Sequence, residues 1–535
     1  MTSSTQHGAF AMPMFNSFVP SSIRPWIYLL FAFTFQLSGG VYLGSLNHMI
    51  GSTALMREDL LMCMYANLAG MAIYFPLLFR MKFRFTNKTL LTSAATGVLL
   101  CNLFAPHITF LPLLWLVCFI EGICKIQGTF ECMSNIQLWL TPKRDFTIFF
   151  PVLHIVILCS IQLSDLLTVY LAHYFSWEFM HWFICGIMII DLLVLRTCIC
   201  HFRFMRKFPL FGIDWLGGAL WAAFSLQVAF IFDYGDWYDW WNSPIIRQVT
   251  FTSLATLIIA VWRMHTIRHP FLEPAMWKYK RLLPLLLLIT LVEGFLATEH
   301  VLEEVFYEEV MHYHETVFVQ LNWWAIVGIL GGCGFSFWWM HLQKLNYIKL
   351  ILVGFGILIC YLMGYYFIIS SDIHLSQLYP IVFCRGFAYS ILSIVFITSL
   401  QQLMSFPHFF QSLGVFNMLH MVVGGVLGAA IYTQGLSYYI PDNLSRYGSY
   451  VDNVSFSRSP FPFNEYMEEF ILQMMEISIK QIYGWVIYGC IFLFLLLLIW
   501  DAPIRRQHLK KIPNWKDVGR EVKNSYWRVR NKQIK

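Results

Sequence analysis

Long apolar runs separated by short polar segments form the dominant pattern of this sequence. Each run reaches roughly 17 residues or more, the length that a helix needs to cross the hydrocarbon core of a bilayer. The runs are too continuous for the alternating strands of a membrane barrel, and only helices or closed barrels satisfy the backbone there. The pattern therefore predicts an all-α polytopic membrane protein with fourteen transmembrane helices. The expected spans are residues 26–50, 59–79, 89–105, 109–136, 146–172, 179–200, 214–232, 245–263, 282–302, 316–340, 349–370, 377–404, 411–434 and 481–501.

Two of these runs, 214–232 and 245–263, are joined by a short loop rich in tryptophan and aspartate. We interpret them as a helical hairpin inserted between two bundles of six helices. The expected parts are a cytoplasmic N-terminus (1–25), an N-terminal six-helix bundle (26–200), the hairpin with its cytoplasmic linkers (201–281), a C-terminal six-helix bundle (282–501) that includes an outer segment (434–480), and a basic cytoplasmic tail (502–535).

Lysine and arginine indicate how the spans are oriented, because cytoplasmic loops of membrane proteins carry an excess of both. With the N-terminus inside, most basic residues fall in the inner segments. Both chain termini are therefore expected in the cytoplasm, and a sequence pI of about 8.6 follows from topology and not from nucleic-acid binding. The outer segments hold only Arg57, Arg247, Arg446, Arg458 and Lys480.

The composition agrees with a membrane protein: 58% of the residues are hydrophobic and 12% are charged, and the mean hydropathy is +0.60. Residues 1–20 hold no lysine or arginine, so the first span is expected to be retained and not cleaved as a signal. No HExxH, GxSxG or phosphate-loop motif appears, and we expect no enzymatic activity. The 13 cysteines include no C-x-x-C pair at zinc spacing, and neither a cofactor nor a metal site is expected.

Several short motifs occur in an order that matches the six–two–six layout. Asp214-Trp215-Leu216-Gly217 opens the seventh span, and His269-Pro270-Phe271-Leu272 precedes the ninth. Together these features resemble the fourteen-span branch of the major facilitator superfamily, the EmrB/QacA-like drug:proton antiporters, over nearly the whole chain. The other segments that carry the resemblance are Trp177–Phe183, Trp240–Pro244, Phe383–Phe387, and Gln411–Gly414 followed by Gly424–Gly428.

The chain departs from that branch at the motifs associated with antiport. In the loop between the second and third spans Arg80 is kept, but the family's acidic residue is Phe79. The glycine-rich antiporter motif of the fifth span is replaced by Ser164–Val169, and the first span has no carboxylate. In the fourth span the usual arginine is Cys118. The resemblance therefore implies the fold, while the family's usual proton-coupling residues do not carry over.

Ionisable residues inside the spans are the candidate functional groups, because a charge at mid-membrane costs roughly 2.5–3.5 kcal/mol and needs a partner or a role. Glu121 and Lys125 are one helical turn apart on the fourth span. They form either a mutually neutralised pair or a site at which Glu121 titrates in a central cavity. Lys125 is a candidate charge partner or substrate contact. Asp165, near mid-depth in the fifth span, is a second candidate proton carrier or a structural partner of Lys125.

The C-terminal half offers Glu293 and Glu299 on the ninth span and Arg385 on the twelfth. Glu293 lies deepest and is the main candidate for proton exchange in this half. Arg385 requires a carboxylate or an anionic substrate group, and Glu299 is a candidate charge partner or substrate contact. Near the expected cytoplasmic ends, three residues are candidates for a gate, namely Arg80, Asp191 and Arg196.

Two outer segments have their own patterns. Residues 303–315 are rich in glutamate and histidine and are expected to be a solvent-exposed loop, with an extension of the ninth span as the alternative. A negative vestibule that attracts cations, a surface for a partner, and a zinc site at Glu304, Glu308 and His312 are the further interpretations. Residues 464–480 are expected to form an amphipathic helix that lies on the membrane surface or contacts a partner.

The resemblance implies a secondary transporter that exports amphiphilic small molecules in exchange for protons, by alternating access, across the bacterial cytoplasmic (inner) membrane. A periplasmic membrane-fusion adaptor and an outer-membrane channel are the implied partners in a cell with two membranes. The lost antiport motifs leave open a dedicated transporter of one metabolite, such as a siderophore. A transporter-like sensor or scaffold without transport is the alternative of another class.

Overall fold

The computed structural model describes residues 14–39, 41–44, 46–53, 55–141, 145–203, 210, 212–370, 372–450 and 462–511. These residues are almost entirely helical, and the only β-type pairing among them is a single bridge between Phe15 and Ile199. Thirteen helical stretches in the described chain are long and apolar enough to cross a membrane. Each coincides with one of the predicted spans from 59–79 onwards. The prediction of an all-α polytopic membrane protein is confirmed.

The N-terminal half contains the broken first span and five long helices. The predicted span 26–50 is divided, because its first helix ends at Leu37 and the next begins at Val41. The elements are α1 (Arg24–Leu37), α2 (Val41–Gly44), α3 (Leu46–Ser52), α4 (Arg57–Tyr74) with its continuations η2 (Phe75–Leu77) and α5 (Leu78–Arg84), α6 (Asn87–Phe104), α7 (Leu111–Leu140), α8 (Phe146–Tyr174) and α9 (Glu178–Cys198).

The C-terminal half is built in the same way, with several helices continued by π-helical turns. Its elements are α12 (Leu282–Leu296) with η6 (Glu299–Glu303) and η7 (Phe306–Val310), α13 (Glu315–Phe318), α14 (Leu321–Phe337) with η8 (Trp338–Leu342), α15 (Tyr347–Ile368), α16 (Tyr379–Leu403), α17 (Phe406–Asn417) with η10 (Met418–Gly424), α18 (Gly425–Gly448) and α20 (Phe463–Lys511).

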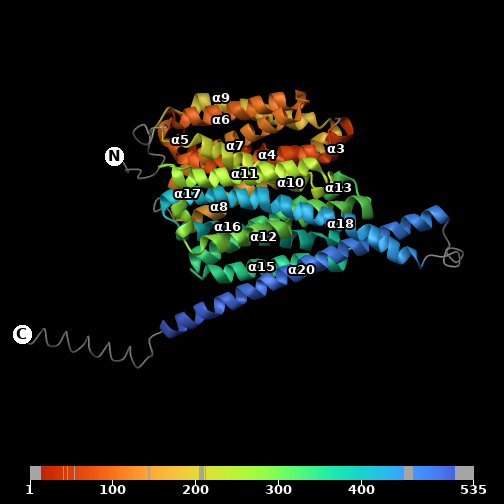
Figure 1. Cartoon of the computed structure of the whole chain (residues 1–535). Coiled ribbons are helices and arrows are strands. Elements are labelled where there is room, and N and C mark those ends of the chain that lie inside the picture. Colours follow the sequence, from red (N-terminus) through yellow and green to blue (C-terminus); the bar gives the residue numbers. More distant parts are fainter. Residues whose placement is uncertain are drawn as a thin grey trace, which may run out of the picture.

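The predicted hairpin is present as α10 (Trp215–Asp233) and α11 (Pro244–Thr266), joined through the short helix η4 (Trp240–Asn242). Helix α10 packs against α4 of the first half and against α18 and η10 of the second. The hairpin therefore lies along the junction between the two halves, as Figure 1 shows.

The contacts of Asp214 give a structural reason for the Asp214-Trp215-Leu216-Gly217 motif at the start of the hairpin. Its carboxylate accepts hydrogen bonds from the Gly217 backbone N–H (2.9 Å) and from Nε (2.9 Å) and Nη2 (2.7 Å) of Arg263. It thus caps the N-terminus of α10 and ties that end to the last turn of α11. Gly218 leaves room for the Phe271 ring, since a Cβ there would lie 3.1 Å from Cε2 of that ring, and a Cβ at Gly217 would collide with the Asp214 carboxylate.

The two ends of the bundle differ in charge, and they are named here for that difference. The basic end holds Arg80, Arg84 and Arg263, and the acidic end holds Glu58 and Asp233. By the distribution of basic residues, the basic end is the one predicted to face the cytoplasm.

Two elements at the acidic end differ from the expectation. The ninth span continues through η6 and η7 to Val310, so the alternative of an extended ninth span is confirmed for residues 303–310 and the expected loop is wrong. Residues 464–480 are helical as predicted, but they form the first part of the 49-residue helix α20 and not a separate element. In Figure 1, α20 runs obliquely past the bundle, and beside α18 it projects beyond the other helices. Asn443 of α18 donates to Ser478 Oγ of α20 at 2.9 Å.

Candidate functional site

A cavity of about 280 Å³ lies between the two halves, close to the lower end of the range typical of small-molecule sites. We call it the central cavity. Its walls come from α4, α7 and α8 of the first half, from α10 of the hairpin, and from α12, α14, α16 and α18 of the second half. The apolar part of the wall includes Leu61, Leu68, Leu158, Ile161, Leu296 and Ile329, and the charged part includes Arg57, Glu58, Lys125, Asp233, Glu293, Glu299, Glu304 and Arg385.

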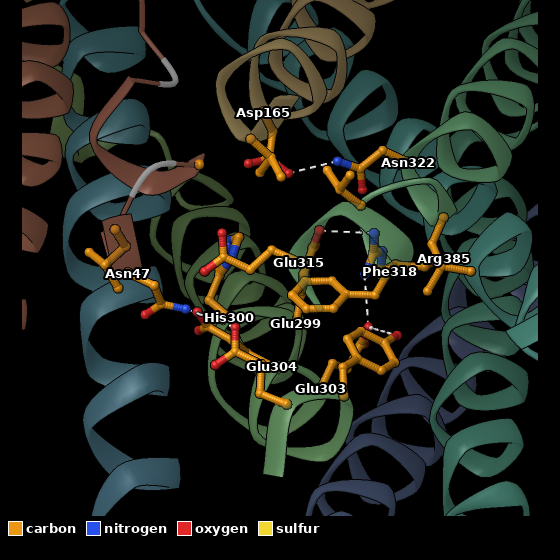
Figure 2. Close-up of a pocket in the computed structure, with 17 residues that line it drawn as sticks. Asn47, Asp165, Glu299, His300, Glu303, Glu304, Glu315, Phe318, Asn322 and Arg385 are labelled. Carbon is orange, nitrogen blue, oxygen red and sulfur yellow. Dashed lines mark hydrogen bonds and ion pairs between the residues drawn. The ribbon is translucent and has the colours of Figure 1, made fainter. Parts of the chain in front are cut away.

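A second cavity of about 110 Å³, the acidic-end cavity, adjoins the first. Leu46, Glu299, His300, Glu304 and Arg385 line both. Figure 2 shows that the acidic-end cavity is surrounded by carboxylates of the extended ninth span, with Asp165 facing it from the other half. The segment 303–310, expected as a loop, thus forms a wall of the site.

Arg385 of α16 is held between two carboxylates of η6. Its Nη2 lies 2.9 Å from Glu299 Oε1, and its Nη1 lies 3.0 Å from Glu303 Oε2. The side chains of Arg385 and Glu303 are 7% and 1% exposed, whereas Glu299 is 25% exposed on the cavity side. Of the two expected kinds of partner for Arg385, a carboxylate or an anionic substrate group, the structure shows carboxylates, and both Nη atoms of its guanidinium are paired with them.

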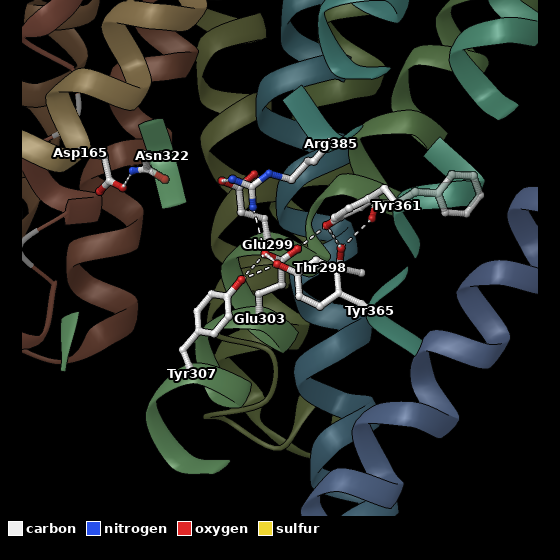
Figure 3. Close-up of polar contacts among 10 residues, drawn as sticks. Asp165, Thr298, Glu299, Glu303, Tyr307, Asn322, Tyr361, Tyr365 and Arg385 are labelled. Atoms are coloured by element: carbon white, nitrogen blue, oxygen red, sulfur yellow. Dashed lines mark hydrogen bonds and ion pairs between the residues drawn. The ribbon is translucent and has the colours of Figure 1, made fainter. Parts of the chain in front are cut away.

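Three tyrosines complete the surroundings of Glu303 (Figure 3). Tyr365 and Tyr307 donate to Glu303 Oε2 at 2.8 and 3.1 Å, and Tyr361 donates to Oε1. Buried ion pairs are stable only when further hydrogen bonds satisfy the remaining lone pairs, and these phenols supply them. Sequence reasoning missed this cluster. The available signal was the pair Tyr361 and Tyr365, one turn apart inside an otherwise apolar span.

Glu293 of α12 faces the central cavity beside a histidine that the sequence analysis did not single out. Glu293 Oε1 lies 2.5 Å from Nε2 of His420 on the π-helical segment η10. The imidazole is stacked between Tyr389 and Phe416, with ring centroids 6.3 and 5.5 Å away. The Glu293 and His420 side chains are 15% and 6% exposed. A carboxylate and an imidazole in contact at the wall of a cavity form a pair that can hold and exchange a proton.

Lys125 and Glu121 attract each other electrostatically, as expected for a pair, but in the described chain no direct salt bridge joins them. Glu121 Oε1 accepts from Asn102 Nδ2 at 2.8 Å, and Asn102 Oδ1 contacts Nδ1 of His181 at 2.8 Å. Glu121 thus lies inside the first bundle, and it lines neither of the two cavities. Lys125 lines the central cavity. Among the described residues it has neither a hydrogen-bond nor an ion-pair partner at its ammonium.

Asp165 of α8 contacts the other half directly. Its Oδ2 accepts from Nδ2 of Asn322 on α14 at 2.7 Å. It does not pair with Lys125, which was the structural alternative. Asp165 lines the acidic-end cavity, whereas Gln162, one turn earlier, lines the central cavity. The contact joins the two halves at the edge of the site.

The two halves also meet at the acidic end through polar side chains. Arg57 Nη2 lies 3.0 Å from Glu304 Oε2, and Asn47 Nδ2 donates to Glu308 Oε1 at 2.8 Å. Within the described chain, no group of three or more His, Cys, Asp or Glu side chains is arranged to hold a metal ion.

At the basic end, the halves meet through aromatic rings. Phe79 of α5 and Phe410 of α17 have ring centroids 4.1 Å apart. Phe130 of α7 is 5.2 Å from Phe79, and Phe150 of α8 is 6.5 Å from Phe409. Phe79 occupies the position of the acidic residue in the resembling motif. An apolar contact therefore stands where that motif has a charge.

The three candidate gate residues are placed apart. Arg80 Nη1 donates to the Gly212 carbonyl at 2.7 Å, which ties the first half to the hairpin linker. Asp191 accepts from Thr34 Oγ1 at 2.6 Å inside the first bundle. Arg196 is exposed, and no salt bridge joins it to Asp191 in the described chain. Of the three, Arg80 is the one that bridges separate parts of the protein.

No family model and no curated protein matches this chain. Two solved structures share its arrangement over 89% of its length. A mutant form of the nucleoside transporter NupG superposes with a TM-score of 0.55 at 12% identity and is covered over 99% of its own chain. The human organic anion transporter MFSD10 (TETRAN) superposes with a TM-score of 0.54 at 11% identity and is covered in full, at 100%. These similarities establish a shared fold.

Proposed function

Because this chain has the major facilitator fold, we propose that it is a proton-coupled secondary transporter of amphiphilic small molecules. The observation that carries the proposal is the central cavity, which both halves and the hairpin line together. A site between two bundles can be exposed alternately to the two faces of the membrane when the bundles rock against each other.

Glu293 and His420 are the proposed proton site. They are in contact at 2.5 Å, and Glu293 faces the cavity in which a substrate would bind. Their contact joins α12 to the π-helical segment η10, and such π-helical turns are frequent at functional sites. A change in the contact between these two elements would expose or cover the pair. Asp165 is the second candidate, because its contact with Asn322 would break as the halves separate.

The cavity supports an amphiphilic cargo, since its wall combines a large apolar surface with charged groups of both signs. The similar proteins are described as a nucleoside transporter and an organic anion transporter. At 12 and 11% identity they do not identify the cargo of this chain. We propose export across a bacterial cytoplasmic membrane with both termini inside, from the basic-residue distribution and the antiporter resemblance. An adaptor and an outer-membrane channel remain proposed partners on the same resemblance.

A dedicated metabolite transporter is the second candidate function. Lys125 favours it, because a cation that has no partner among the described residues suits a defined anionic group better than a broad range of drugs.

The proposal is tested with purified protein in liposomes that contain a pH-sensitive dye. A concentration gradient of a transported compound should drive proton movement across the liposome membrane, and this movement should stop when the compound's gradient is removed. Glu293→Gln should uncouple the two fluxes, and Glu309→Gln, at an exposed carboxylate that lines neither cavity, should leave them coupled. The absence of proton flux across a broad panel of acidic, basic and neutral amphiphiles, with folded protein, would contradict proton coupling.

A further inference from the structure

Lys125 is the most unusual charge in the central cavity. Its side chain is only 4% exposed, yet its ammonium has no hydrogen-bond or ion-pair partner among the described residues. Burial of a charge without a partner is costly. A transporter that retains such a charge in its central cavity needs a reason for it.

None of the carboxylates near Lys125 forms a direct salt bridge with it in the described chain, although Glu121 attracts it electrostatically. Glu121, one turn away on α7, is bonded to Asn102, and Asp165 is bonded to Asn322. Glu299 is paired with Arg385. The two other cavity cations are paired as well, since Arg57 is bonded to Glu304 and Arg385 to Glu299 and Glu303. Of the lysine and arginine side chains that line the cavity in the described part of the chain, Lys125 is the one without a direct salt bridge, and its ammonium can therefore contact a ligand.

The backbone around Lys125 is shaped to admit this ammonium. Nζ lies directly against Gly39, where the first span is interrupted between α1 and α2. A Cβ on residue 39 would overlap the ammonium. Interrupted helices in transporters place backbone polar groups at substrate sites. The glycine and the break together give Lys125 a fixed place at the cavity wall.

We propose that Lys125 binds the anionic group of the transported compound, and that the substrates of this protein are organic anions with an apolar body. The apolar body would lie against Leu68, Leu158 and Ile161 of the same cavity. A buried ammonium attracts an anion strongly, because the low local dielectric weakens the field less than water does. This proposal rests on the proposed transport function, because the bound anion is a substrate only if the protein transports it.

Equilibrium binding tests the proposal without any gradient. The melting temperature of the full-length protein in detergent is measured with sets of compounds that share one apolar group and differ in the charge of the end group. The first set is 4-phenylbutyrate, 4-phenylbutyramide and 4-phenylbutylamine. Two further sets place the same acid, amide and amine on a naphthyl and on a decyl group. The acids should raise the melting temperature most. In Lys125→Met they should bind about tenfold more weakly or worse, which is the usual cost of losing a hydrogen bond to a charged group.

Three further variants separate a binding role from a structural one. Gly39→Ala should also weaken the acids, because it displaces the ammonium, and Lys125→Arg should retain a preference for acids. Lys349→Met, at an exposed lysine, should behave as the parent. Binding of the neutral amide in Lys125→Met shows that the variant is folded.

An equal or greater effect of the amines or amides on the parent would overturn the proposal, as would an unchanged preference for acids in Lys125→Met. So would the failure of every acid to stabilise the parent. If acids bind through Lys125 but no flux occurs in liposomes, the transport proposal fails and the anion site stands. If flux occurs without a preference for acids, the transport proposal stands and the anion site fails.

Discussion

Arg385 is held between Glu299 and Glu303, two carboxylates one turn apart on the extension of the ninth span, at 2.9 and 3.0 Å. The two pairs are not equivalent. Glu303 is 1% exposed and Glu299 is 25% exposed. The buried pair fixes the guanidinium inside the second bundle, and the other faces the cavities. Arg385 is thereby both a structural anchor and a part of the cavity wall.

This difference in burial predicts different effects of two similar substitutions. Glu303→Gln should destabilise the protein by roughly 3–5 kcal/mol, the usual cost of breaking a buried ion pair. Glu299→Gln should cost much less, because water at the cavity can replace part of the lost interaction. Thermal unfolding of the two variants in detergent measures the difference. Equal losses in both would show that the two carboxylates support Arg385 alike.

The cluster around Glu303 also shows where sequence reasoning stopped. The apolar pattern of the ninth span fades after residue 302, and the dense glutamates that follow resemble a solvated loop. In the structure the helix continues through π-helical turns. The partners that make this burial tolerable, Arg385 and Tyr361, are more than fifty residues away. Local periodicity cannot reveal them.

The sequence predicts the spans and the hairpin, but it does not predict the side-chain partners of Glu293, Glu121 and Lys125. The spans and the hairpin were predictable because long apolar runs have one main solution in a bilayer. Glu293 was recognised as a deep carboxylate, but its neighbour His420 was not, since a lone histidine in an apolar span carries no spacing signal. Glu121 and Lys125 have the spacing of a pair, yet no direct salt bridge joins them in the described chain, and Asn102 from a neighbouring helix donates to the Glu121 carboxylate.

The contact between Glu293 and His420 predicts how coupling is lost. His420→Gln should reduce substrate-dependent proton flux while equilibrium binding of the substrate persists, because the imidazole acts on the proton and does not line the central cavity. Glu293→Gln should have the same effect. If the two residues act as one unit, the double variant should be no worse than either single variant. The flux assay in liposomes and a binding assay on the same preparations give the two readouts. Unchanged flux in both single variants would remove this pair from the proton pathway.

The aromatic contact between Phe79 and Phe410 predicts that the basic end is closed by packing and not by charge. Phe79→Ala should open a path to the central cavity, and a cysteine introduced by Leu68→Cys should then react faster with a membrane-impermeant thiol reagent added at the basic end. The labelling is read after subtraction of the parent protein's own cysteines.

Phe79→Leu should retain most of the closure, since it keeps apolar bulk. Phe251→Ala is the control, because Phe251 is 79% exposed on the hairpin. The reference is the labelling rate of Leu68→Cys alone. If that rate is unchanged when Phe79→Ala and Phe410→Ala are both added, these rings do not form the closure.

Asp214 predicts a pH dependence of stability. Burial opposes ionisation of this carboxyl, but the hydrogen bonds from Arg263 and from the Gly217 backbone outweigh it and hold its pKa below the usual value. A carboxyl whose folded pKa is depressed stabilises the protein at pH values above its unfolded pKa, which is about 3.9. That stabilisation is lost as the pH falls through the lower, folded pKa. Asp214→Asn keeps a capping side chain and removes the charge, so it isolates the interaction with Arg263.

The variant should be less stable than the parent by about 1 kcal/mol near neutral pH, as expected for a mostly buried carboxylate with a half-exposed arginine. The difference should stay constant from pH 8 to about pH 5 and shrink below about pH 4. Melting temperatures of both proteins over this range measure it. Because the cap is retained, a difference that persists unchanged at low pH would mean that the charge of Asp214 does not contribute to closing the hairpin. The parallel variant Arg263→Gln should then be tested for the same profile, since loss of either partner removes the same interaction and should give the same dependence on pH.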